Sequence, residues 1–187
     1  MSRGSRNRFL TVVVLAIIIL AGIVAWKGYA LAEMSRSMDV RAVAVASYYR
    51  DLLSRETPGI AVSGSGSAEE RDALGALRSA DLATDGRTRL EVLGQIVDVQ
   101  KRLDAFFGAI AQDDLIAESD AAVRLRADAA RDGDLKPLLD GYNVVAQSWN
   151  NEQENPLGGM YFRLFKLRPA QLLGTDGRVE FETKVSL

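Results

Sequence analysis

An apolar run of 18 residues, from Phe9 to Trp26, limits what this chain can fold into more than any other feature. The run holds no charge and only one hydroxyl group, that of Thr11, and twelve of its 18 residues are Leu, Ile, Val or Phe. At ~1.5 Å per residue, a helix of this length spans about 27 Å, close to the ~30 Å hydrocarbon core of a bilayer. Insertion into that core would be favoured by very roughly 5 kcal/mol. The run therefore predicts one transmembrane anchor over residues 9–26.

The two flanks of the run indicate how the anchor would be oriented. Three arginines, Arg3, Arg6 and Arg8, lie in the basic N-terminal segment 1–8, whereas Lys27 stands beside the aromatic Trp26 at the other end. Positive charge is retained on the cytoplasmic side of a membrane, and aromatic residues gather at the interface. We therefore expect a single-pass protein whose N-terminus is cytoplasmic and whose larger part lies outside.

A cleaved signal peptide is the alternative interpretation of the same segment. Ala30-Leu31-Ala32, followed by Glu33, has the small residues that a signal peptidase reads. However, the apolar region of a signal peptide is usually about 7–15 residues long, and this run is longer. Lys27 also separates the run from the candidate cleavage site. A retained anchor is therefore preferred, and cleavage after Ala32 remains the competing prediction.

The composition excludes several classes of function. The chain has neither cysteine nor histidine, which removes disulfides, thiol chemistry, the usual zinc sites and Ser-His-Asp or Cys-His catalysis. Its 23 basic and 25 acidic residues give a net charge of −2, which argues against nucleic acid as a partner. Adjacent acids occur at Asp113-Asp114 and at Asp132 and Asp134, where they are typical of helix caps. No catalytic residue, metal site or cofactor is predicted.

Beyond the anchor, apolar residues recur at alternating spacings of three and four, the pattern of a helix with one buried face. These patterns cover residues 29–55, 68–83, 88–110, 115–130 and 135 to just before Pro156. The first continues the anchor with only Gly28 between them, so the two could form one long helix. Capping boxes at Ser67/Glu70 and Thr88/Glu91 mark two helix starts. The sequence predicts an all-α fold, an antiparallel bundle over residues 27–174 on a transmembrane helix, with a flexible Gly- and Ser-rich loop over residues 57–68.

The C-terminal part has a different character. Residues 157–169 are apolar, aromatic and basic without clean periodicity. The tail over residues 175–187 begins with a turn at Thr175-Asp176-Gly177 and then alternates Val179, Phe181, Thr183 and Val185. Alternation of this kind predicts one short strand, for which the sequence offers no obvious partner.

A set of motifs in the last third of the chain resembles the LemA family of bacterial membrane-anchored helical proteins. Tyr142-Asn143 and Trp149-Asn150 stand seven residues apart, where the family has Tyr-Asn twice. The similarity continues with the residues Pro156, Gly158, Gly159, Leu164, Phe165, Leu167, Arg168 and Pro169, where the family ends in a Leu-Phe-Gly-Phe-Lys-Pro type of run. The Leu-Ile-Pro-Asn-Leu stretch of the family's first long helix is replaced here by residues 52–56, Leu-Leu-Ser-Arg-Glu. The chain thus looks like a divergent member.

The resemblance implies a helical bundle on a membrane stalk in the bacterial cytoplasmic membrane, without an established enzymatic activity. It leads us to expect a structural or scaffolding protein of the cell envelope that contacts an unidentified protein partner. A regulatory or sensory module of a membrane signalling system is the alternative, and it would need an output domain on another chain. Tyr142 and Trp149 lie on one helical stripe, so we expect them to pack in the core, with Asn143 and Asn150 bonding a neighbouring backbone or the segment 157–169. The competing hypothesis is a partner-binding surface that includes Phe165 and Arg168.

Overall fold

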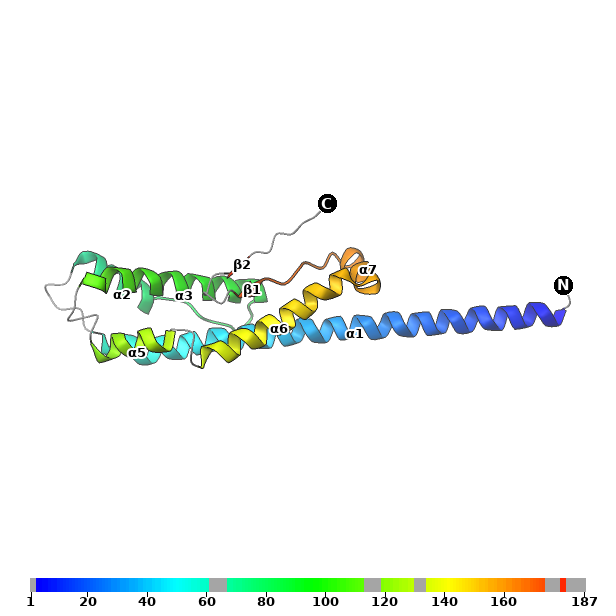
Figure 1. Ribbon diagram of the computed structural model, residues 1–187, viewed down its shortest axis with the longest axis horizontal. Helices are drawn as coiled ribbons and strands as arrows, with labels where there is room; N and C mark the ends of the chain where they lie inside the picture. The colour runs from blue at the N-terminus through cyan, green and yellow to red at the C-terminus, as the bar shows by residue number, and fades with distance from the viewer. Residues whose placement is uncertain (1–2, 61–66, 113–118, 130–133, 174–178, 181–187) are drawn as a thin grey trace. The chain divides into compact units, whose positions relative to one another are not determined.

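A computed structural model describes residues 3–60, 67–112, 119–129, 134–173 and 179–180 (Figure 1). This part of the chain is mostly helical. Its α-helices are α1 (Arg3–Glu56), α2 (Ala68–Arg78), α3 (Arg89–Ala109), α5 (Asp120–Ala129), α6 (Leu135–Glu154) and α7 (Pro156–Leu164). Short 3-10 turns follow two of them, η1 (Thr57–Gly59) and η2 (Ile110–Gln112), and the strands are β1 (Leu172–Leu173) and β2 (Val179–Glu180).

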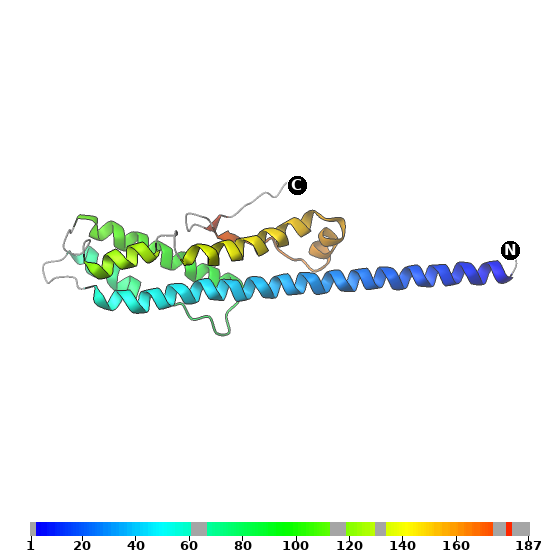
Figure 2. The same cartoon turned by 60° about the horizontal axis from the view of Figure 1, so that its bottom comes forward.

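Helix α1 joins the expected anchor and the helix after it into one unbroken helix of 54 residues, which Figures 1 and 2 show in blue and cyan. Gly28 does not interrupt it, and the side chain of Tyr161 lies close to the helix at this position. The first half of α1 is long and apolar enough to cross a membrane. The helix ends one residue before the η1 turn, whose Pro58 cannot continue the α-helical hydrogen bonding.

The chain divides into two compact units, and both α1 and α6 contribute to each of them. The first unit comprises Met1–Arg36 and Ser148–Ala170, and the second comprises Ser37–Gln147 and Gln171–Leu187. The first unit thus combines the N-terminal part of α1 with the end of α6, α7 and the residues up to Ala170.

The second unit has its core between the helical faces that the sequence pattern indicates. Every residue of the two strongest stripes is buried: Met38, Ala42, Val45, Tyr49 and Leu52 on α1, and Val92, Ile96, Val99, Leu103, Phe106 and Ile110 on α3 and η2. A buried hydrogen bond of 2.9 Å from Gln100 Nε2 to the Tyr49 hydroxyl joins these two helices. The predicted core faces of both helices are therefore confirmed.

Pairs of contacts fix the direction of two helices relative to α1 within this unit. Arg89 bonds Asp39 and Gln100 bonds Tyr49, so the residue numbers of α3 and α1 rise together and the two helices run in the same direction. In contrast, the Tyr48 hydroxyl donates to the Asp128 carbonyl while Arg124 pairs with Glu56. The numbers of α5 fall as those of α1 rise, and α5 therefore runs in the opposite direction.

Both predicted capping boxes form, at Ser67/Glu70 before α2 and at Thr88/Glu91 before α3. Helix α2 is nevertheless shorter than its pattern, because it ends at Arg78 rather than near residue 83. The Asp81 carboxylate accepts a hydrogen bond of 2.9 Å from the Ala83 amide two residues on, a local bond that competes with helical bonding. Leu82 is still buried, although it lies outside the helix.

At the start of the loop expected over residues 57–68, the Arg78 guanidinium donates 2.9 Å hydrogen bonds to the carbonyls of Thr57 and Ile60. Residues 61–66 of that loop lie outside the described chain. Two expectations about the C-terminal part need correction. Helix α7 occupies a stretch for which the sequence predicted no element. The tail strand has a partner, because β2 pairs with β1 in an antiparallel register, Leu172 with Glu180 and Leu173 with Val179. Phe181, Thr183 and Val185 are beyond the residues described.

Candidate functional site

The motif-bearing helix α6 turns its two aromatic residues into the protein. Tyr142 and Trp149 have exposed fractions of 0% and 4%. Seven residues is nearly two helical turns, so both lie on the stripe that also buries Leu135 and Leu139. The interpretation of these aromatics as packing residues agrees with their burial.

In the first unit, Trp149 and Asn150 hold the backbone of the chain that follows α7. The indole Nε1–H of Trp149 donates a 2.9 Å hydrogen bond to the Arg168 carbonyl, and its ring packs on Phe162 with centroids 5.0 Å apart. Asn150 Nδ2 donates to the Ala170 carbonyl at 3.0 Å, and the Ala170 amide donates back to Asn150 Oδ1 at 2.7 Å. Each side chain satisfies a backbone group that no regular secondary structure satisfies.

In the second unit, Tyr142 and Asn143 bond the backbone of Gln171, just before β1, and of Leu173, within β1. The Tyr142 hydroxyl donates to the Gln171 carbonyl at 3.0 Å, and burial raises the pKa of Tyr142 to about 12. The hydroxyl therefore stays protonated, and remains a donor, at physiological pH. Asn143 Nδ2 donates to the Leu173 carbonyl at 2.5 Å, and the Leu173 amide returns a 2.8 Å hydrogen bond to Asn143 Oδ1.

Sequence reasoning singled out these four side chains but missed the full extent of their partner segment. It named residues 157–169 or a neighbouring backbone, whereas the bonded residues run from Arg168 to Leu173. Peptide groups accept such bonds whatever their side chains are, so no sequence signal marks residues 170–173 as partners. The polar atoms of Asn143 and Asn150 are engaged in these backbone bonds.

The other motif residues lie around α7. Pro156 is the first residue of this helix, where its missing N–H costs nothing. Phe165 and Arg168, the residues suggested for a partner surface, are exposed, and the Phe165 ring stacks on Tyr161 with centroids 5.4 Å apart. Pro169 is exposed as well. These side chains are thus exposed, whereas Tyr142 and Trp149 on α6 are buried.

A second polar cluster ties α7 and the end of α6 to α1, at the end of its apolar run. The Lys27 ammonium pairs with Glu152 at 2.5 Å, and its hydrogen bond holds the pKa of that carboxyl below the ordinary value. The Tyr161 hydroxyl donates to the Val24 carbonyl. The aromatic ring lies so near Gly28 that a Cβ there would be 3.3 Å from it. Helix α7 is thus fixed beside residues 24–28 of α1.

Among the residues that the structure describes, no group of three or more acidic side chains is arranged to bind a metal ion. Asp113, Asp114 and Asp132 lie outside this range, and Asp134 is exposed just before α6. The buried carboxylate of Glu56 instead accepts hydrogen bonds from Arg124 at 3.0 Å and from Arg55 at 2.7 Å. Those bonds lower its pKa and keep it ionised in a structural ion pair.

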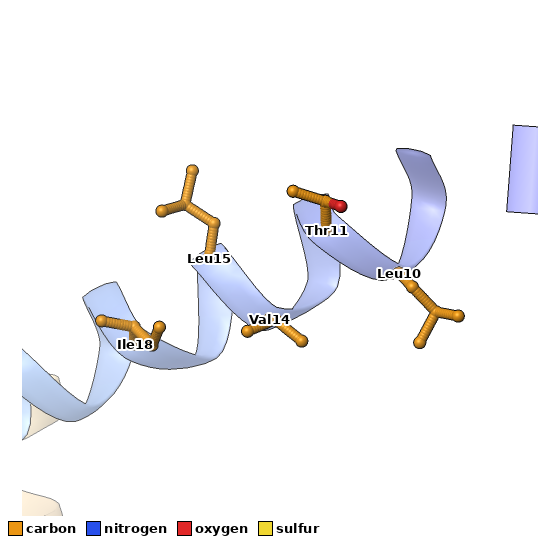
Figure 3. Close-up of a pocket in the computed structure, with 5 residues that line it drawn as sticks. All are labelled: Leu10, Thr11, Val14, Leu15 and Ile18. Carbon is orange, nitrogen blue, oxygen red and sulfur yellow. The ribbon is translucent and has the colours of Figure 1, made fainter. Parts of the chain in front are cut away.

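A shallow hollow on the apolar half of α1 is not a binding pocket of the usual kind. It is lined by Leu10, Thr11, Val14, Leu15 and Ile18, whose side chains all project from one helix (Figure 3). Ligand sites are concave and built from several elements that converge on the ligand. A hollow on the surface of a single exposed helix provides no such convergence.

Comparison of the chain with protein-family models, characterised proteins and solved structures found no match. The resemblance to the LemA family therefore stays a prediction that depends on the motifs of residues 142–169.

Proposed function

We propose that this protein is a membrane-anchored helical bundle with a scaffolding role at the bacterial cell envelope. The observation that carries the proposal is the uncovered apolar surface of α1, where the side chains from Leu10 to Ile23 are exposed. Ile18, for example, has an exposed fraction of 62%. An apolar surface of this extent is unfavourable in water and favourable in a bilayer. The anchor would be residues 9–26, in contact with lipid.

Retention of the anchor is supported by contacts that cleavage would remove. Val24, Lys27 and Gly28 lie before the candidate cleavage site after Ala32, and all three contact residues of the C-terminal third. A cut there would leave Glu152 and Tyr161 without these partners. We expect protein extracted from membranes to retain its N-terminus, as intact-mass analysis would show. A mature chain that starts at Glu33 would make it an exported domain without an anchor.

The orientation follows from the positive charges of the N-terminal segment, Arg3, Arg6 and Arg8, which exceed those near the other end of the run. We propose that the N-terminus is cytoplasmic and that the helical bundle lies outside. Protease added to intact spheroplasts should then digest the bundle. If the bundle is protected until the membrane is disrupted, the orientation is the reverse.

A scaffolding role is supported by the chemistry of the candidate site. The side-chain amides of Asn143 and Asn150 are engaged in backbone hydrogen bonds, and the buried Glu56 carboxylate is paired with two arginines. Function must be argued from a site, and these groups are organised for stability. In-cell crosslinking from single cysteines on exposed positions such as Val144, followed by mass spectrometry, tests the role. A stoichiometric envelope protein supports scaffolding, and a kinase or protease partner would favour a regulatory module instead.

A further inference from the structure

Helix α7 carries an apolar stripe that faces away from the protein. Its inner face is formed by Gly158, Tyr161 and Phe162, which are buried. On the outer face are Leu157, Met160 and Leu164 at spacings of three and four. The exposed Phe165, whose ring stacks on Tyr161, follows the helix. Leu164 and Phe165 have exposed fractions of 67% and 64%. Four large apolar side chains clustered on a short surface helix form a patch that water disfavours.

The same segment is positively charged. Residues 156–169 contain Arg163, Lys166 and Arg168 and no acidic residue. All three basic residues are exposed. Lys166 stands just after the helix in the left-handed conformation, with φ 50°, and the Leu167 amide closes the turn by donating to the Phe162 carbonyl at 2.9 Å. This turn, which normally takes glycine, presents a lysine beside the apolar stripe.

Helix α7 contacts α1 close to the point where the apolar run of α1 ends. The Tyr161 hydroxyl bonds Val24, which lies two residues before the end of the apolar run at Trp26. At ~1.5 Å per residue, α7 is attached within about 3 Å of the level at which that run ends. The two exposed aromatics Trp26 and Tyr29 flank the same level on α1.

We infer that α7 is an interfacial helix of the bilayer that α1 crosses. It inserts its exposed apolar side chains into the boundary between headgroups and acyl chains: Leu157, Met160, Leu164 and Phe165. The basic side chains of Arg163, Lys166 and Arg168 bind anionic lipid headgroups. The inference rests on the proposed anchoring of α1. An apolar face with flanking cations is the recognised chemistry of helices that lie in the membrane interface. The lipid partner is favoured over a protein because the patch continues the surface that contacts lipid on α1 and has the charge that anionic headgroups require.

The absence of cysteine from the chain allows the test to be made on the complete protein. The variants Ile18→Cys, Leu164→Cys and Val40→Cys would each carry one environment-sensitive fluorophore, after reconstitution in vesicles of phosphatidylcholine and phosphatidylglycerol. Val40 is the matched control, because it is an exposed apolar residue about 21 Å beyond Trp26 along the same helix. Met160→Cys gives a second position on α7 should the Leu164 variant fail to fold.

We expect bromine on the lipid chains to quench the labels at positions 18 and 164, and aqueous iodide to quench the label at position 40. A label at position 164 that responds like that at position 40, while position 18 is quenched by lipid, overturns the interfacial helix and leaves the anchor intact. A label at position 18 that lipid does not quench overturns the anchor itself. The two proposals therefore fail in distinguishable ways.

The charge contribution is tested by a triple variant, Arg163→Gln/Lys166→Gln/Arg168→Gln, in the Leu164→Cys background. A cation near an anionic surface favours contact by about fivefold, so loss of three should reduce the ratio of lipid-contacting to water-exposed label on the order of 100-fold. Lys136→Gln, which removes an exposed cation elsewhere, should leave this ratio unchanged. Equal ratios for the triple variant and its parent in phosphatidylglycerol vesicles would overturn the assignment of anionic lipid.

Discussion

The side-chain amide of Asn150 exchanges two hydrogen bonds with the backbone of Ala170, one in each direction, at 3.0 and 2.7 Å. A carboxamide offers the same donor and acceptor as a peptide group, so the pair reproduces one step of a strand ladder without a neighbouring strand. Asn143 exchanges the same two bonds with Leu173, a residue of β1 that also pairs with Val179 of β2. Helix α6 thereby provides hydrogen-bond partners for an extended segment that would otherwise leave backbone groups unpaired.

The variant Asn150→Ala should lower the free energy of unfolding by about 1–3 kcal/mol, because it leaves two backbone groups of Ala170 without partners. Hydrogen exchange measured on the full chain in detergent should show faster exchange of the Ala170 amide. Asn151→Ala, at the exposed neighbouring position, is the control and should change neither quantity. Unchanged exchange at Ala170 in the Asn150 variant would contradict the role given to this pair.

Trp149→Ala should cost about 3–5 kcal/mol, the range for buried large aromatic residues. The substitution removes the ring that packs on Phe162 and the donor to the Arg168 carbonyl. Thermal unfolding should be followed on the full chain, because removal of the anchor would also remove Val24 and Lys27 from the first unit. Val144→Ala, on an exposed position of α6, should stay within about 0.5 kcal/mol of the parent. A melting temperature of the Trp149 variant within a degree or two of the parent would, on the scale of roughly 2–4 °C per kcal/mol, show that the ring is not packed.

The stability contribution of Glu56 should depend on pH. Hydrogen bonds from Arg124, and then from Arg55, hold the pKa of its carboxyl below the ordinary value of 4.5. A group whose pKa is lowered by folding stabilises the protein above its unfolded pKa, and this contribution is lost as the pH falls through the folded pKa. Glu56→Gln should therefore lower the melting temperature by several degrees at neutral pH, and its difference from the parent should shrink below pH 4.5.

Glu154→Gln, on an exposed residue of α6, provides the control for this titration and should follow the parent throughout. A difference between parent and Glu56→Gln that stays constant across the acidic range would show that the ion pair with Arg124 is not its source.

Gly158→Ala should destabilise the first unit by about 1–3 kcal/mol through overpacking. A Cβ at this position would collide with the Glu152 backbone carbonyl, where α7 folds back on the end of α6. Gly94→Ala is the matched substitution on α3, where the added Cβ would meet nothing within 4 Å beyond the local backbone of its own helix. It should stabilise the protein by about 0.5–1 kcal/mol. Circular dichroism melts of both variants test the contrast, and a change of the same sign in both would contradict it.

The long helices were predictable because their signals are local. The apolar stripes that include Val45 and Val99 repeat with the helical period. The capping boxes that begin at Ser67 and Thr88 are patterns of only four consecutive residues. Such patterns indicate where a helix begins and which face it buries. They do not indicate which helix covers that face, so the parallel course of α1 and α3 had no signal in the sequence.

Helix α7 and the details of the site depend instead on distant contacts. Two glycines, Gly158 and Gly159, weaken the helical pattern of α7, which has only nine residues. The helix is instead held in place by the hydrogen bond from Tyr161 to the carbonyl of Val24, which is distant in the sequence. The backbone partners of Asn143 and Asn150 cannot be recognised, because a peptide group has the same chemistry at every position. The spacing of the motifs on α6 located the donors, and only the fold could supply the acceptors.

The hydrogen bond between Tyr161 and Val24 joins residues 137 positions apart in the sequence. During translation, Val24 is therefore synthesised long before Tyr161. At about 5–20 residues per second, the ribosome would need roughly 7–27 s to synthesise the chain between them. Helix α1 would emerge and enter the membrane first, while the residues that pair with Lys27 and cover Gly28 are still unmade. With α1 anchored as proposed, the first unit would be completed late, when the nascent chain returns to a helix already in the membrane. An arrested or truncated chain would then leave the anchor with this contact surface uncovered.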